Sequence, residues 1–87
     1  MKYAVYIIYS PSLDKYYRRY SQDSAVRVAG HNAGRGRYTS RATDWQLVYV
    51  EVMDTKTQAI VRERSIKKYS RNQVEQLIRS AVNVLNN

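Results

Sequence analysis

The chain has 87 residues, enough for one small domain with a shallow active site. It has no cysteine and a single histidine, which excludes disulfides, thiolate metal sites and a structural zinc site. Fifteen Lys and Arg against seven Asp and Glu give a net charge of +8, which favours a polyanionic partner such as nucleic acid. Nine tyrosines with no phenylalanine supply rings that pack, bind phosphate or stack on bases.

The N-terminal apolar run is short, and Tyr, Ser and Pro interrupt it without a small-residue cleavage site behind them. It is therefore expected to be a strand and not a signal peptide. No stretch approaches the roughly 20 apolar residues of a membrane span. We expect a single domain over residues 1–87, located in the cytoplasm and without membrane contact.

Two tyrosine-rich, β-prone runs at residues 2–9 and 15–20 flank a Pro-Ser-Leu-Asp turn. This pattern predicts a hairpin whose arms set Tyr6 and Tyr17 against each other. A third strand is expected over residues 45–53, where aromatic and β-branched residues dominate. Three strands covered by helices are about the least that is independently stable.

A short helix is expected over residues 22–32, with Gly34 just past its end as a stop signal. Arg27 and His31 lie four residues apart and so share one face of this helix. Such a pair can point at one ligand, although a solvated helix face is the alternative.

A basic loop follows at residues 34–41, where glycines allow close backbone approach and arginines supply charge. Its composition is typical of a phosphate-contacting loop and equally of a solvated linker. The residues in this loop that we expect to contact nucleic acid are Arg35, Arg37, Tyr38 and Arg41.

Two capping boxes predict the last two helices. Thr55 with Gln58 precedes a helix over residues 58–68, and Ser70 with Gln73 repeats the arrangement. The final helix is expected to carry a regular apolar stripe that packs in the core and has no chemical role: Val74, Leu77, Ile78, Ala81, Val82 and Leu85.

Glu63 is a carboxylate on a helix face that should be covered. Its neighbours on the helical lattice are Ala59, Ile60, Ile66 and Lys67. A buried carboxylate is normally paired, hydrogen-bonded or bound to a cation, so an ion pair with Lys67 or Arg62 and a catalytic or metal-binding role both remain open. As a metal ligand it would be the single anion expected of a Mg²⁺ or Mn²⁺ site, with Glu51 as a distant helper.

Landmarks in this order and spacing resemble the GIY-YIG nuclease superfamily, in particular its small single-domain bacterial members of uncharacterised type. The resemblance covers roughly residues 3 to 80. It is carried by Ala4-Val5-Tyr6, Tyr17-Arg18-Arg19, Arg27, His31, the loop at 36–39, Trp45, and Glu63 within Arg-Glu-Arg-Ser-Ile-Lys-Lys.

The resemblance implies an α/β (α+β) domain with a three-stranded antiparallel sheet flanked by helices. The implied order is strand, strand, helix, strand, helix, helix. It also implies metal-dependent hydrolysis of a phosphodiester by water, with Mg²⁺ or Mn²⁺ as the cofactor.

Site roles are carried over from the resemblance one residue at a time. Tyr6 would act as general base or orient the attacking water, and Tyr17 would position water or the scissile phosphate. Arg27 would stabilise charge on the phosphate, and His31 would assist by hydrogen bonding or proton transfer. Glu63 would hold the divalent ion. Further contacts to nucleic acid are expected from Arg19 and Lys67.

The second motif departs from the family pattern, because Arg18 and Arg19 stand in place of an aliphatic residue and a glycine. Arg19 has three possible fates: it points to solvent, contacts the nucleic-acid backbone, or obstructs the site. Arg18 is expected to reach solvent or an acidic partner, because an unpaired buried guanidinium is strongly destabilising.

We therefore expect a small metal-dependent endonuclease that acts on DNA in preference to RNA. The alternative is a nucleic-acid-binding module on the same scaffold whose cleavage is weakened or lost through Arg18 and Arg19. A third class is a structural or partner-binding protein in which the +8 charge is incidental, and it predicts no salt-dependent affinity for DNA or RNA. The sequence leaves the oligomeric state open.

Overall fold

The sheet has three antiparallel strands in the order β2-β1-β3: β1 (Tyr3–Ser10), β2 (Lys15–Ser21) and β3 (Gln46–Met53). The computed structural model describes residues 2–22, 32, 34 and 39–86. The expected fold class, an α+β domain built on this sheet, is confirmed. The helix expected over residues 22–32 falls almost wholly outside the described residues.

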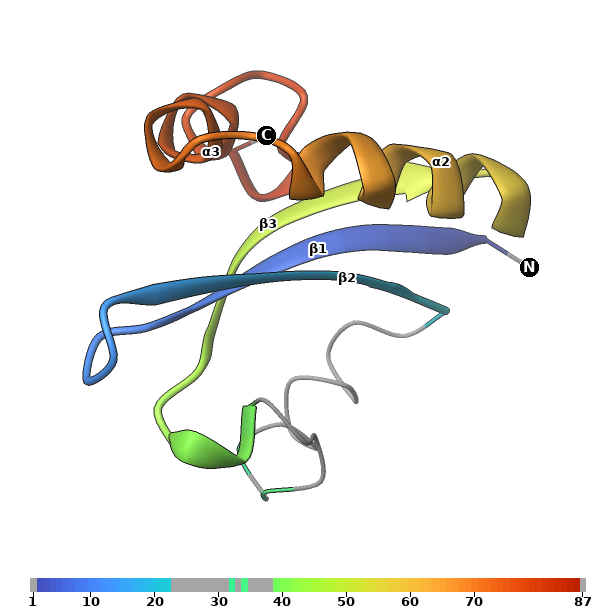
Figure 1. The fold of residues 1–87 in the computed structure, drawn as a ribbon. Coiled ribbons are helices and arrows are strands. Elements are labelled where there is room, and N and C mark those ends of the chain that lie inside the picture. The colour runs from blue at the N-terminus through green and yellow to red at the C-terminus, as the bar shows by residue number, and fades with distance from the viewer. Residues whose placement is uncertain (1, 23–31, 33, 35–38, 87) are drawn as a thin grey trace.

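Two helices, α2 (Lys56–Lys67) and α3 (Arg71–Ile78), lie on one side of the sheet (Figure 1). Both expected capping boxes are present, because Thr55 and Ser70 each accept a hydrogen bond from the backbone N–H three residues on, and the glutamine there accepts one from the backbone of the cap residue. These boxes satisfy N–H groups that a helix start otherwise leaves unpaired. The first helix begins at Lys56, two residues earlier than expected. A short 3₁₀ turn, η1 (Thr39–Arg41), lies on the other side of the sheet.

The expectation of a long final helix is wrong, because α3 ends at Ile78 and the apolar stripe does not continue. Val82 and Leu85 are 50% and 49% exposed instead of buried. The chain turns away because the Asn83 amide donates to the carbonyl of Ile78 at 2.8 Å and then reaches the sheet. A second 3₁₀ turn, η2 (Val84–Asn86), follows.

Asn83 closes the outer edge of β3. Its side-chain oxygen accepts from the N–H of Val50 at 3.1 Å, and its amide donates to the carbonyl of Val48 at 2.9 Å. The side chain is almost completely buried. One amide thus takes the hydrogen-bonding positions that a further strand would occupy, which shields an edge that could otherwise pair with another chain.

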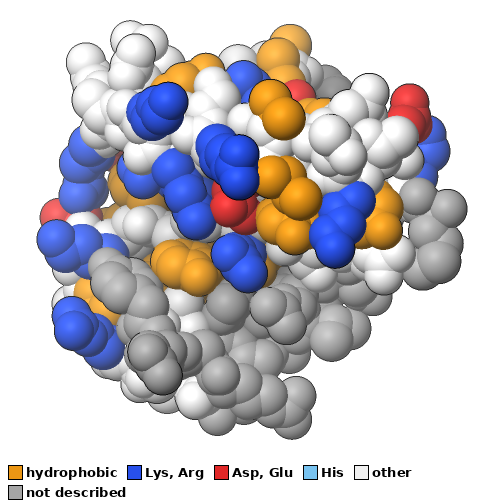
Figure 2. Space-filling view, turned by 45° about the vertical axis from the view of Figure 1, so that its right-hand side comes forward, with side chains coloured by type: hydrophobic (Ala, Val, Ile, Leu, Met, Phe, Trp, Pro, Cys, Tyr) orange, Lys and Arg blue, Asp and Glu red, His pale blue; other side chains and the backbone are white. Residues whose placement is uncertain are grey.

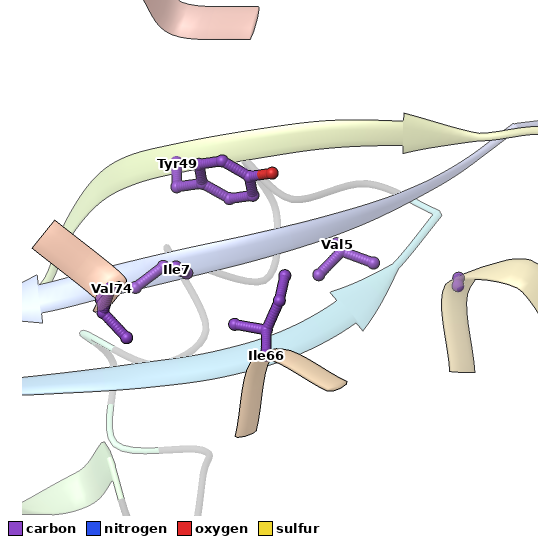
Figure 3. Packing of buried hydrophobic residues seen from close by; sticks show 6 residues of the cluster. Val5, Ile7, Tyr49, Ile66 and Val74 are labelled. Atoms are coloured by element: carbon purple, nitrogen blue, oxygen red, sulfur yellow. The ribbon is translucent and has the colours of Figure 1, made fainter. Parts of the chain in front are cut away.

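The central strand β1 is buried on both faces, which explains its continuous apolar run. Toward the helices it contributes Val5 and Ile7 to a cluster completed by Tyr49, Ala59, Ile66 and Val74 (Figure 3). Toward the other side it contributes Tyr6 and Ile8 to a cluster completed by Ala42, Trp45 and Val50. The sheet therefore separates two small cores.

Polar side chains fasten the segment before β3 to the sheet. Asp44 accepts from the Ser10 hydroxyl at 2.7 Å and from the Ser12 N–H at 2.9 Å, which ties it to the hairpin turn. The Asn32 amide pairs with the backbone of Trp45, accepting at 2.7 Å and donating at 3.0 Å. These contacts fix the position of Trp45, which packs in the cluster with Tyr6 and Ile8.

Candidate active site

Tyr6 and Tyr17 lie on the same face of the hairpin but are not directly opposed. The strand pairing sets Tyr6 opposite Arg19 and Tyr17 opposite Ile8. Residues offset in this way are diagonal neighbours, which remain within reach of aromatic side chains. Tyr6 is completely buried, whereas Tyr17 is partly buried and packs near Trp45 with ring centroids 6.4 Å apart.

Glu63 comes from α2 and is only 6% exposed. Its Oε1 pairs with Lys67 Nζ at 3.1 Å, one helical turn away. Its Oε2 is buried and accepts no hydrogen bond from the described residues, and Arg19 Nη1 stands 4.0 Å from it. Glu63 is therefore ion-paired through one oxygen, while the other lacks the hydrogen bond that a buried carboxylate oxygen normally has.

The other pairing considered for Glu63, with Arg62, does not form. Arg62 Nε instead donates to Glu51 at 2.9 Å, and the Tyr49 hydroxyl donates to the same carboxylate. Burial raises the pKa of Tyr49, and the bond to Glu51 raises it further. Glu51 is thus engaged in a structural network on β3 and does not serve as a second carboxylate for Glu63.

The two arginines of the second motif lie in different surroundings. Arg18 is partly buried on the helix side, its Nε is buried, and no described residue accepts a hydrogen bond from that atom. Burial lowers the pKa of this guanidinium. Arg18 was expected to reach solvent or an acidic partner. For its Nε atom this expectation is wrong, because that atom is buried and has no partner among the described residues. Arg19 is 40% exposed and lies beside Glu63 with its guanidinium 5.6 Å from the Tyr20 ring centre.

Together Arg18, Arg19, Glu63 and Lys67 form what we call the β2–α2 seam, where the outer strand meets the helix. One open groove of about 380 Å³ is lined by Tyr16, Tyr17, Arg18 and Lys67. A second groove of about 320 Å³ is lined by Tyr3, Arg19, Tyr20, Ser21, Gln22 and Lys56. Figure 2 shows how Lys and Arg side chains gather on one face of the molecule around an acidic side chain and patches of hydrophobic surface.

The structure brings some of the predicted site residues together. Arg19, Glu63 and Lys67 meet at the seam, and Tyr17 borders one of its grooves. Tyr6 does not join them, because its side chain is buried in the cluster on the side of the sheet away from α2. Arg41 is exposed at the end of η1. The predicted residues outside the described part of the chain are Arg27, His31, Arg35, Arg37 and Tyr38.

Sequence reasoning missed the roles of two residues, one at the seam and one at the opposite edge of the sheet. Arg18 was expected to reach solvent or an acidic partner and was given no contact with nucleic acid, but it lines a groove of the seam, which depends on which face of β2 turns toward α2. Asn83 gave no signal in the sequence, because on the expected helix it lies outside the apolar stripe, on the polar face with Arg79 and Ser80.

Comparisons with known proteins show which family the chain belongs to. A family model described as the GIY-YIG catalytic domain matches residues 2–76. A UPF0213 protein of Haloquadratum walsbyi is 40% identical over 81 residues, which cover 92% of this chain and 90% of that protein. The chain belongs to the GIY-YIG family. A UPF0213 protein of Staphylococcus saprophyticus is 43% identical over 63 residues, covering 71% of this chain and 77% of its own.

A solved GIY-YIG relative supports the fold. The solution NMR structure of a UPF0213 protein from Bacillus halodurans matches with a TM-score of 0.60 at 28% identity, covering 98% of this chain and 90% of that one. Family membership gives nuclease as the general class of activity, with nucleic acid as the general partner. Among the described residues no helix is long and apolar enough to cross a membrane.

Proposed function

We propose that this GIY-YIG domain is a metal-dependent endonuclease that hydrolyses phosphodiester bonds in DNA. The observation that carries the proposal is Glu63, whose buried Oε2 has no hydrogen-bond donor among the described residues, beside Arg19 and Lys67. An oxygen in this state suits a cation that arrives with the substrate. As part of the same proposal, the protein acts in the cytoplasm.

The donor set fits Mg²⁺ or Mn²⁺. No group of three metal-binding acidic, histidine or cysteine side chains occurs among residues 2–22, 32, 34 and 39–86, so Glu63 would be a lone carboxylate ligand. Mg²⁺ commonly binds through one or two carboxylates and keeps waters and substrate phosphate oxygens in its other positions. When bound, the ion polarises the phosphate and stabilises the leaving oxygen.

The chain's own residues would position and activate the attacking water. Tyr6 or Tyr17 would orient that water or accept its proton. A free phenol is a weak base at pH 7, so proton transfer to a tyrosine would need roughly 4 kcal/mol of stabilisation of the phenolate, part of which a bound divalent cation would supply. Arg27 would hold two phosphate oxygens with its fork of donors, and His31 would assist proton transfer.

DNA would be held through its backbone. Basic side chains at the seam and in the loop before β3 bind phosphates and carry no base information, so we expect little sequence specificity. The side chains in these roles are Arg19, Arg35, Arg37, Tyr38, Arg41 and Lys67.

Nicking of supercoiled DNA with Mg²⁺, Mn²⁺ or EDTA tests the proposal. Glu63→Gln keeps the side-chain shape but removes the charge, and we expect nicking to fall about a hundredfold or more because the metal supplies several kcal/mol. Asp54→Asn is the matched control, since Asp54 is exposed, pairs with Lys2 at 2.5 Å and lines neither groove of the seam. That variant should nick at the wild-type rate.

Two outcomes would contradict this assignment. Nicking that survives Glu63→Gln unchanged would show that Glu63 holds no essential metal. Wild-type protein that binds DNA without nicking it would select the second candidate, a nucleic-acid-binding module. The position of Arg19 beside Glu63 and the complete burial of Tyr6 favour that second candidate.

A further inference from the structure

The groove lined by Tyr16, Tyr17, Arg18 and Lys67 has a guanidinium in its wall that pairs with no carboxylate among the described residues. Arg18 Nε is buried and has no hydrogen-bond acceptor among the described residues. A guanidinium presents five donors in a planar fork and remains charged at all ordinary pH values. Because Arg18 as a whole is only partly buried and lines the groove, the groove offers an anion a charged side chain at its wall.

The charges around this groove also favour an anion. Lys67 lines it and remains 47% exposed, even though its ammonium contacts Glu63. On the other side, the Tyr16 hydroxyl donates to Glu75 at 3.2 Å, and Arg71 neutralises that carboxylate from 3.5 Å. No described carboxylate pairs with Arg18. The local balance is positive, and burial of Arg18 limits its screening by solvent.

We propose that Arg18, together with Lys67 and Tyr17, forms a phosphate subsite that holds a nucleic-acid backbone phosphate next to the one that is cleaved. The proposal rests on the nucleic-acid partner of the function proposed above. Lys67 connects the two places, because its ammonium lies 3.1 Å from the Glu63 carboxylate and its side chain lines the groove. A strand that places one phosphate at Glu63 reaches the groove with a neighbouring phosphate.

This subsite gives a function to Arg18, which stands where the second motif of the family has an aliphatic residue. An aliphatic residue at position 18 would fill the same space without a donor. Arg18 adds a cation at the mouth of the site, and the arginine fork matches two phosphate oxygens better than an ammonium does. The Tyr17 ring, partly exposed at the same groove, offers a surface for the attached sugar or base.

The test measures binding of a fluorescein-labelled DNA oligonucleotide by anisotropy over a range of NaCl concentrations, in EDTA so that no cleavage occurs. For Arg18→Leu we expect weaker binding and a slope of log affinity against log salt that is smaller by about one, as for loss of one phosphate contact. Arg18→Lys should retain most of the slope. Arg79→Leu, which removes an exposed arginine at the end of α3, should leave the slope unchanged.

A second readout covers the case in which Arg18→Leu does not fold. In wild-type protein the Arg18 Nε–H resonance should shift on titration with the unlabelled oligonucleotide, while that of Arg79 stays in place. Equal slopes for Arg18→Leu and Arg79→Leu, or an Arg18 resonance that does not respond, would overturn the subsite.

These outcomes are distinct from failure of the nuclease proposal. If the wild-type protein nicks DNA but Arg18→Leu binds DNA with the full salt slope, only the subsite proposal is contradicted. If the wild-type protein binds DNA with the expected dependence on Arg18 but never nicks it, only the nuclease proposal is contradicted. Absence of any DNA binding would overturn both.

Discussion

Arg19 stands where the family pattern has a glycine, and it lies beside the carboxylate that we assign to the metal. Its guanidinium is 4.0 Å from Glu63 Oε2, and Lys67 holds the other oxygen. Any divalent ion must compete with these two cations for Glu63. Arg19 is partly exposed, so its hold on the carboxylate is worth up to about 1 kcal/mol.

Arg19→Gly should therefore lower the Mg²⁺ concentration that gives half-maximal nicking, by up to about fivefold for about 1 kcal/mol. Titration of nicking with MgCl₂ measures this shift. Arg19→Lys is the control, because it keeps a cation near Glu63 and should stay close to wild type. A half-maximal concentration that is unchanged or higher in Arg19→Gly would show that Arg19 does not compete with the metal.

The sequence predicted that Glu63 is buried, but it did not predict which cations pair with it. Helical spacing places Glu63 among Ala59, Ile60 and Ile66, and its burial follows from that lattice alone. Which cations reach it depends on how α2 lies across β2 and β3. That arrangement directs Arg62 to Glu51 and brings Arg19 to Glu63, and neither contact is local in sequence.

Two side-chain amides carry out hydrogen bonding that usually belongs to the backbone. Asn83 completes the ladder at the edge of β3, and Asn32 bonds both backbone groups of Trp45 at the start of that strand. The apolar spacing through Val82 and Leu85 predicted a helix because local periodicity was the only signal available. The two β3 partners of Asn83, Val48 and Val50, lie more than 30 residues away, so the sequence could not show them.

Asn83→Ala should destabilise the fold by about 2–4 kcal/mol, because it leaves the N–H of Val50 and the carbonyl of Val48 without their partner. Urea unfolding followed by circular dichroism measures the change. Asn72→Ala, at an exposed position on α3, should cost far less. Equal unfolding midpoints for the two variants would show that the edge of β3 gains nothing from Asn83.

Across the whole molecule, carboxylates tie the hairpin to both layers that flank the sheet. Asp14 accepts from the Tyr9 hydroxyl and from Arg71 of α3, each at 2.6 Å, while Asp44 holds the turn from the opposite layer. The β-prone runs predicted the strands and the two capping boxes predicted the last two helices, since both signals are local in sequence. Neither signal predicted these ties, because they join segments 32 to 57 positions apart.

Acid should weaken the fold through these two carboxylates. The hydrogen bond from Tyr9, followed by that from Arg71, lowers the pKa of Asp14, and the Ser10 hydroxyl is the main cause of the lowered pKa of Asp44. A depressed folded-state pKa contributes stability above the unfolded value near 4, and this contribution is lost as pH falls through the folded pKa.

The urea midpoint of the wild-type protein should therefore fall between pH 5 and pH 2.5, where the growing positive charge of an already basic chain acts in the same direction. The double variant Asp14→Asn with Asp44→Asn separates the two causes. It should have a lower midpoint at pH 7 and a weaker dependence on pH, because it lacks both carboxylates but retains the general charge. Parallel curves for the two proteins over this range would show that repulsion alone, and not the loss of these ties, drives acid unfolding.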